Sequence, residues 1–270
     1  MVLSASQYLG LLAAEAAQIV LPAGPRRRVA TGGAYQSVLD DAQRDLSLRQ
    51  RYVAADGPNI SPAERRDDAE RAMELASLLY SAGAPHSSWR RWAALTSVGL
   101  LLAGECPADA AVWAVLSRDR GLIHRLPPAV SVSKPHPAEI IHRLATRDRA
   151  GGADDGPHQE PTDQFDRHWF ELGRSIPVGD HRRIEAALRA ISDHWIQELE
   201  DGDQFHAHSY PDFDPESNAA ATLAAAAGWS PQHLDDAERA FLEPGLVPGE
   251  PEPLAPDLLP PPSAGETMEK

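Results

Sequence analysis

Apolar residues return at intervals of three and four along several stretches of the chain, which places them on one face of an α-helix. Residues 61–80 begin with Ser61-Pro62-Ala63-Glu64, which supplies a capping serine, a proline at the first helical position and a glutamate at the third. Residues 184–199 carry one apolar stripe, formed by Ile184, Leu188, Ile191, Trp195 and Leu199. Both segments are predicted to be helices with one buried face.

The same spacing predicts further helices near residues 4–20, 34–55, 88–104, 108–117 and 137–149. Asp214-Pro215-Glu216 and Ser230-Pro231 repeat the cap-then-proline signature on either side of Gly228, so two helices are expected to form a hairpin there. Alternating β-branched runs are nearly missing, and residues 130–133 are too short and too close to prolines to build a sheet. The fold class is therefore predicted to be all-α, as an irregular multi-helix bundle or a short solenoid of helical hairpins.

Two breaks in the helical pattern predict the domain organisation. Residues 150–157 contain only small, charged and turn-forming residues, so a flexible loop is expected at about 150–162, inside a single helical domain over residues 1–242. From Glu243 onward, proline recurs at 244, 248, 251, 253, 256, 260, 261 and 262. Residues 243–270 are accordingly predicted to be a disordered, acidic, Pro-rich tail.

The apolar segments do not have the form of targeting or membrane-spanning signals. Residues 8–23 lack a preceding positive charge and are interrupted by Glu15 and Gln18, and the run at 93–103 is too short to cross a bilayer. Cys106 is the single cysteine, so no intrachain disulfide can form. A cytoplasmic location without membrane association is expected.

Charge is distributed unevenly along the chain. The formal net charge is −15, but residues 1–150 carry 18 basic and 15 acidic residues, whereas residues 151–270 carry 7 and 25. An excess of acidic residues disfavours direct binding of nucleic acid, which depends on Lys and Arg. The asymmetry favours either a basic protein partner or a solvated acidic face.

Residues 206–214 hold the first candidate for chemistry, because imidazole and carboxylate groups bind zinc or iron. His206 and His208 lie in this segment, and His194 lies one helix earlier. The spacing argues against a metal site, since the two nearby histidines fall in an irregular segment and Asp214 is better explained as a helix N-cap. No metal or other cofactor is predicted.

Two other motifs receive structural interpretations. Cys106 follows Glu105, whose charge would raise the thiol pKa. Sequence motifs of serine hydrolases, zinc proteases and phosphate-binding loops are missing. The protein is therefore not predicted to be an enzyme. Trp89 and Trp92 are three residues apart and share a face with Leu95, whereas Arg90 and Arg91 are expected to point outward. This pattern predicts a core seam rather than a surface for stacking on bases.

Acidic residues gather at the end of one predicted helix and at the start of the next. At a helix C-terminus, negative charge is locally unfavourable. A binding surface for a basic protein would place acidic residues there in spite of this cost. The predicted partner-binding residues are Glu198, Glu200, Asp201, Asp203, Asp212 and Glu216.

The C-terminal hairpin resembles the closing segment of all-helical immunity proteins of bacterial polymorphic toxin systems. The resemblance covers Phe213-Asp214-Pro215-Glu216, the alanine-rich run around Leu223, Gly228, and Phe241 to Leu246. It implies a small cytoplasmic protein that neutralises a cognate, often basic, toxin domain by occluding its active site. A helical scaffold or adaptor without a toxin partner, and a helical metalloenzyme that uses His194, His206 and His208, remain the alternatives.

Overall fold

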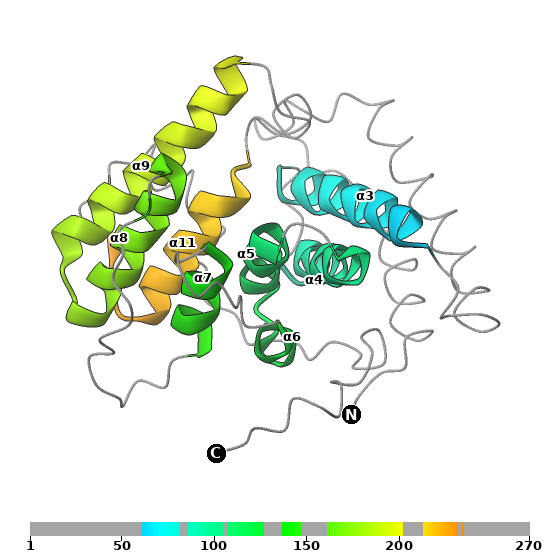
Figure 1. Cartoon of the computed structure of the whole chain (residues 1–270), viewed down its shortest axis with the longest axis horizontal. Coiled ribbons are helices and arrows are strands. Elements are labelled where there is room, and N and C mark those ends of the chain that lie inside the picture. Colours follow the sequence, from blue (N-terminus) through cyan, green and yellow to red (C-terminus); the bar gives the residue numbers. More distant parts are fainter. Residues whose placement is uncertain are drawn as a thin grey trace.

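The structure is a computed structural model that describes residues 61–81, 86–104, 107–126, 137–146, 161, 163–201, 213–231 and 234. Of these residues, 86% are helical and none forms a strand, which confirms the all-α prediction. The helices are α3 (Pro62–Ser81), α4 (His86–Ala103), α5 (Pro107–Ser117), α6 (Arg120–Arg125), α7 (Pro137–Thr146), α8 (Gln164–Val178), α9 (His181–Asp201) and α11 (Pro215–Ala226). They are labelled in Figure 1.

Several predicted elements lie outside the described residues. These are the helices at 4–20 and 34–55, the second helix of the C-terminal hairpin, the segment 130–133, Cys106, nearly all of the loop at 150–162, and the tail at 243–270. Within the described part of the chain, no helix is long and apolar enough to cross a membrane.

The ends of α3 and α11 form as their sequence signatures predict. At α3, the backbone N–H of Ser61 donates to a carboxylate oxygen of Glu64 at 2.8 Å, and the Glu64 N–H donates back to Ser61 Oγ at 3.3 Å. At α11, Asp214 Oδ1 accepts hydrogen bonds from the N–H groups of Glu216 and Ser217, at 2.9 and 3.0 Å. Gly228, with φ +98°, ends α11 in the left-handed conformation.

Helix α5 lies at the centre of the described helices. Every residue from Ala110 to Ser117 is buried, and α5 packs against α4, α7 and α11 (Figure 1). A helix that is apolar on all sides must be covered on all sides, so α4, α7 and α11 are arranged around it. The buried residues form one cluster that extends from Ala69 of α3 to Leu234, beyond α11.

Small residues allow α3 and α4 to approach closely. A Cβ atom added at Gly99 of α4 would lie 2.8 Å from the Cβ of Ala69 and 3.2 Å from the backbone oxygen of Arg65. On the other side of α4, Ser97 Oγ donates a 2.7 Å hydrogen bond to the carbonyl of Ala110 in α5. Helix α4 is therefore held tightly between its two neighbours.

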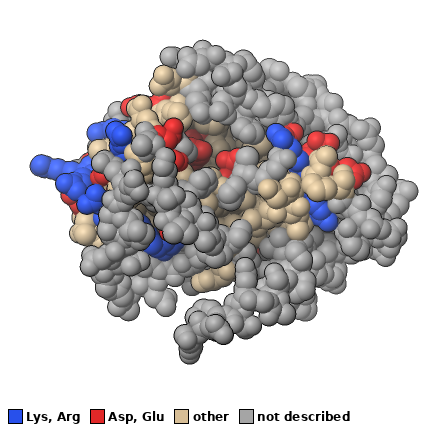
Figure 2. Space-filling model, in the orientation of Figure 1, with Lys and Arg blue, Asp and Glu red and all other residues tan. Residues whose placement is uncertain are grey.

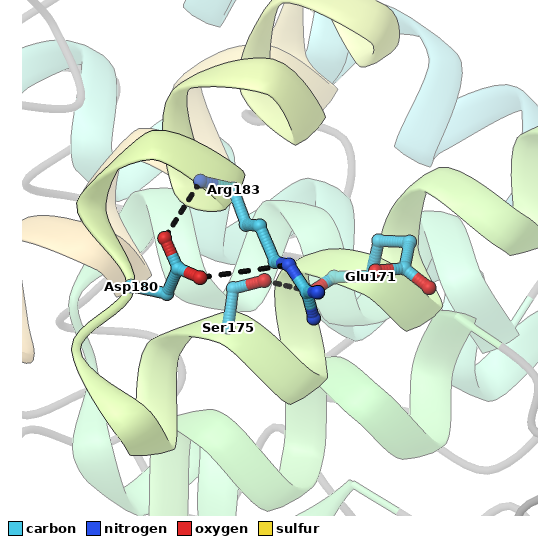
Figure 3. Close-up of polar contacts among 4 residues, drawn as sticks. All are labelled: Glu171, Ser175, Asp180 and Arg183. Atoms are coloured by element: carbon cyan, nitrogen blue, oxygen red, sulfur yellow. Dashed lines mark hydrogen bonds and ion pairs between the residues drawn. The ribbon is translucent and has the colours of Figure 1, made fainter.

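Helices α8 and α9 form an antiparallel hairpin, of which the sequence pattern predicted only α9. The connection is Gly179 and Asp180, with Gly179 at φ +67°. Figure 3 shows Asp180 turned toward Arg183. Its carboxylate accepts from the Arg183 backbone N–H at 3.2 Å and lies 3.5 Å from the guanidinium Nε, so it caps the first turn of α9. On α8, Ser175 Oγ donates to the carbonyl of Glu171.

The aromatic seam of α4 is buried as predicted, but one of its arginines is not where the helical pattern placed it. Trp89 and Trp92 are fully buried, and Leu95 is partly buried against the core. Arg90 was expected to point outward, yet it is only 9% exposed. That prediction is wrong because α4 is packed between α3 and α5, so a position beside its apolar stripe is also covered.

Candidate functional site

The final turn of α9 contains three of the predicted partner-binding residues. Glu198, Glu200 and Asp201 fall in this turn, and no basic residue accompanies them. The last carbonyl groups of a helix carry partial negative charge, so carboxylates there are repelled rather than stabilised. The side chains of these residues are not described, but the backbone that carries them is a helix ending at Asp201.

The last residues of α9 extend beyond its hairpin partner. Helix α8 has 15 residues and α9 has 21. Because the connection is short, about six residues at the end of α9 pass the start of α8, a length of roughly 9 Å. We call residues 196–201 the α9 tip. Figure 1 shows the α9 tip rising past the neighbouring helices. Its first residue, Ile196, is 46% exposed, whereas Trp195 is buried.

The opposite end of α9 carries charge of the opposite sign. Arg182 and Arg183 are exposed in its first turn, where no acidic residue is present. Figure 2 shows Lys and Arg gathered at one end of the visible face, where Figure 1 places the turn between α8 and α9. Arg182 and Arg183 oppose the preference of the helix dipole, whereas the Asp180 carboxylate at the N-cap, 3.5 Å from the Arg183 Nε, agrees with it.

The structure does not bring all predicted partner-binding residues into one place. Glu216 is half-buried in the first turn of α11, and Figure 1 places the start of α11 within the helical body, apart from the α9 tip. Asp203 and Asp212 lie outside the described residues. Of the predicted residues whose backbone is described, Glu198, Glu200 and Asp201 therefore lie together at the end of α9, and Glu216 lies apart from them.

The histidine candidate is only partly within the described chain. His194 is half-buried on α9, whereas His206 and His208 lie outside the described residues. Burial, and then the positive charges of His194 and Arg167, lower the pKa of His168 on α8 below its usual range. Among the described side chains, no group of three or more could hold a metal ion.

Phe213 and Asp214, from the segment that resembles immunity proteins, pack the start of α11 against the core. The Phe213 ring lies 6.2 Å from that of Trp89 and 5.9 Å from that of Trp113, between centroids. Asp214 is completely buried, and the alanine-rich run of α11 is buried through Ala224. Comparison with known protein families, curated proteins and solved structures finds no match for this chain. The structural role of the described motif residues is therefore the one shown by their own contacts.

A second cluster, which the sequence pattern did not predict, lies where α4 and α5 meet. The guanidinium carbon of Arg90 is 5.6 Å from the centroid of the Trp89 ring. Arg118, directly after α5, has φ +61° and is partly buried. Burial, and then the positive charge of Arg90, lower its pKa to about 10. The local sequence Ser117-Arg118-Asp119 does not predict the positive φ of Arg118, because Gly or Asn is the usual residue in that conformation.

Proposed function

We propose that this protein is an immunity protein that binds a basic toxin domain and neutralises it by occluding its active site. The observation that carries the proposal is the α9 tip, which projects from the helical body and ends in an acidic turn. The resemblance of residues 213–246 to immunity proteins and the acidic C-terminal half of the chain give independent support.

The charge of the α9 tip is suited to a basic partner. Carboxylates that are unfavourable at a free helix end become favourable when cationic side chains approach them. A concentrated negative potential also steers a basic domain toward the surface and raises the association rate at low salt. For a toxin that acts on a polyanion, the acidic turn would take the place of part of the substrate.

The apolar residue at the base of the tip supplies an anchor that can be buried in an interface, which charged residues alone do not provide. Ile196 is exposed next to the acidic turn, and an apolar anchor surrounded by polar groups is the usual arrangement of a strong protein interface. In the proposed complex, Ile196 is buried against the toxin while Glu198, Glu200 and Asp201 meet its basic rim. Asp203 and Asp212 extend the contact, and Glu216 contributes at longer range.

The proposal is tested by co-expression with neighbouring reading frames, with co-purification and rescue from toxicity as readouts. Reversal of Glu200, Asp201 and Asp203 to lysine is expected to lower the association rate at least tenfold at low salt and to weaken rescue. Reversal of Glu252, Glu266 and Glu269 makes the same change in net charge and serves as the matched control.

The possible outcomes separate this proposal from a scaffold role. Recovery of a toxin that the wild type neutralises, with binding lost in the tip variant and kept in the control, supports it. If both triple variants slow association equally, only net charge matters and the α9 tip is not the binding surface. If no neighbouring product is toxic and none co-purifies, the immunity function is wrong and a scaffold or adaptor role is favoured.

A further inference from the structure

The side of α9 that faces away from the core carries a regularly spaced row of residues, which we call the α9 stripe. Its members follow one another at alternating intervals of four and three: Arg182, Ala186, Arg189, Asp193, Ile196 and Glu200. The side chains of the first five are exposed, whereas Ile184, Leu188 and Ile191 on the opposite side are buried. Glu200 continues the stripe by its position in the helix. Alternating intervals of four and three are the spacing by which two helices pack along each other.

The order of charges along the α9 stripe is complementary to the same order read in reverse. If two copies of α9 pack antiparallel, with a two-fold axis level with position 191, three kinds of facing pair form, each of them twice: Arg182 with Glu200, Ala186 with Ile196, and Arg189 with Asp193. A parallel arrangement would instead set every charge against an identical charge. The order of the residues therefore favours an antiparallel pair of identical helices.

The charges at the two ends of the α9 stripe oppose the dipole of their own helix but agree with that of an antiparallel neighbour. Arg182 lies in the first turn of α9 and Glu200 in the last, and each has the sign that its helix end disfavours. In an antiparallel pair, the first turn of one helix lies beside the last turn of the other. Arg182 then approaches partial negative charge and Glu200 approaches partial positive charge, so a second copy relieves both conflicts.

The α9 stripe also contains a small and a large apolar residue that fit each other. Within the described part of the chain, Ile196 is one of two large apolar side chains that are exposed, at 46%. Ala186 is exposed as well, and its small side chain leaves room for a larger one from a facing helix. Arg189 already has a contact within its own chain, so the inference depends on the apolar pair and on the outer pair of Arg182 and Glu200.

We infer that the α9 stripe binds the α9 stripe of a second copy of this chain, as an antiparallel dimer with two-fold symmetry. From Arg182 to Glu200 the stripe is about 27 Å long, so the interface is small and the dimer is expected to be weak and sensitive to salt. The dimer does not depend on the existence of a toxin. Because Ile196 and Glu200 also belong to the α9 tip, the dimer and the proposed toxin complex would exclude each other.

The dimer is tested by sedimentation equilibrium of the full chain at low and high salt. The wild type is expected to dimerise reversibly and to dissociate as the salt concentration rises. Arg182→Glu should raise the Kd at least tenfold at low salt, because symmetry makes two pairs repulsive at once. The variant should remain folded, since an acidic residue in the first turn agrees with the helix dipole. Addition of Glu200→Arg to it restores opposite charges and should recover a measurable part of the affinity.

Arg66→Glu is the matched control for the change in net charge. Arg66 is exposed on α3, outside the α9 stripe, and its reversal should leave the Kd within about twofold of the wild-type value. The inference is overturned if the wild type stays monomeric at low salt up to about 1 mM protein. It is also overturned if Arg66→Glu weakens the dimer as much as Arg182→Glu, or if the double charge variant is as weak as Arg182→Glu alone.

Cross-linking tests the antiparallel register. A mixture of the Ala186→Cys and Ile196→Cys variants, treated with a short bismaleimide, is expected to form mixed dimers faster than either variant alone. The wild type, which carries only Cys106, gives the background. A mixture that cross-links no faster than the separate variants would overturn the inference. Such a failure leaves the proposed toxin complex untouched, because that complex is tested by co-purification and rescue.

Discussion

The junction of α4, α5 and α11 and the α9 tip use similar residue types in opposite ways. At the junction, Phe213 is buried between two tryptophans, and Asp214 is fully buried with its carboxylate bonded to backbone N–H groups. At the α9 tip, Ile196 is exposed and acidic residues stand at the helix end that repels them. Stability is therefore expected to be concentrated at the junction, and the interface that we propose lies at the tip.

The largest difference is expected between Phe213→Ala and Ile196→Ala. Loss of the buried ring leaves a cavity beside Trp89 and Trp113, so the free energy of unfolding should fall by about 3–5 kcal/mol. Ile196→Ala at an exposed position should change it by less than about 0.5 kcal/mol. Denaturant unfolding of the two variants measures both values. Equal losses would show that the tip is as important for folding as the junction.

An intermediate effect is expected at the contact between α3 and α4. Gly99→Ala places a methyl group 2.8 Å from the Cβ of Ala69, so it should destabilise the fold by about 1–3 kcal/mol through overpacking. The double variant Ala69→Gly with Gly99→Ala removes the clashing atom and should recover part of that loss. Thermal unfolding of both variants measures the loss of stability and its recovery. No recovery in the double variant would mean that the backbone of α3, rather than the Ala69 side chain, limits the approach.

The N-cap of α11, Asp214, is expected to stabilise the fold more than the N-cap of α9, Asp180. Asp214→Ala removes a buried cap that accepts two N–H hydrogen bonds and should lower the free energy of unfolding by about 1–2 kcal/mol. Asp180→Ala removes a half-exposed cap with a longer 3.2 Å bond, and the loss should be smaller. Replacement by asparagine should preserve most of the stability at both sites. A larger loss of stability in Asp180→Ala than in Asp214→Ala would contradict this prediction.

The smallest effect is a dependence of stability on pH that arises at His168. The folded-state pKa is lowered, first by burial and then by His194 and Arg167, so the unfolded chain binds more protons near pH 6.5 and below. The free energy of unfolding is therefore higher above that pH and decreases as the pH falls through it. Unfolding measured between pH 5 and 8 should show a shallower slope in His168→Gln than in the wild type. An unchanged slope would assign the dependence to other groups.

The missed helix α8 shows where sequence patterns are insufficient. Gly173 and Pro177 both disfavour a helix, although Trp169, Leu172 and Ile176 have helical spacing. The structure explains the glycine, since a Cβ there would lie 2.8 Å from Ile140 Cγ2 of α7. Close packing between helices outweighs the intrinsic preference of that residue. The spacing of the buried residues was the signal that could have revealed the helix.

The sequence by itself determined the all-α class, the capped starts of α3 and α11, the Gly228 stop and the acidic composition of the α9 end. Each of these depends on residues within a few positions of one another, where backbone hydrogen bonds and helical periodicity act. Only the tertiary structure decided that Arg90 is buried and that the Phe213 ring packs against both Trp89 and Trp113. These features depend on which helices pack together, and a helical face does not specify its partner.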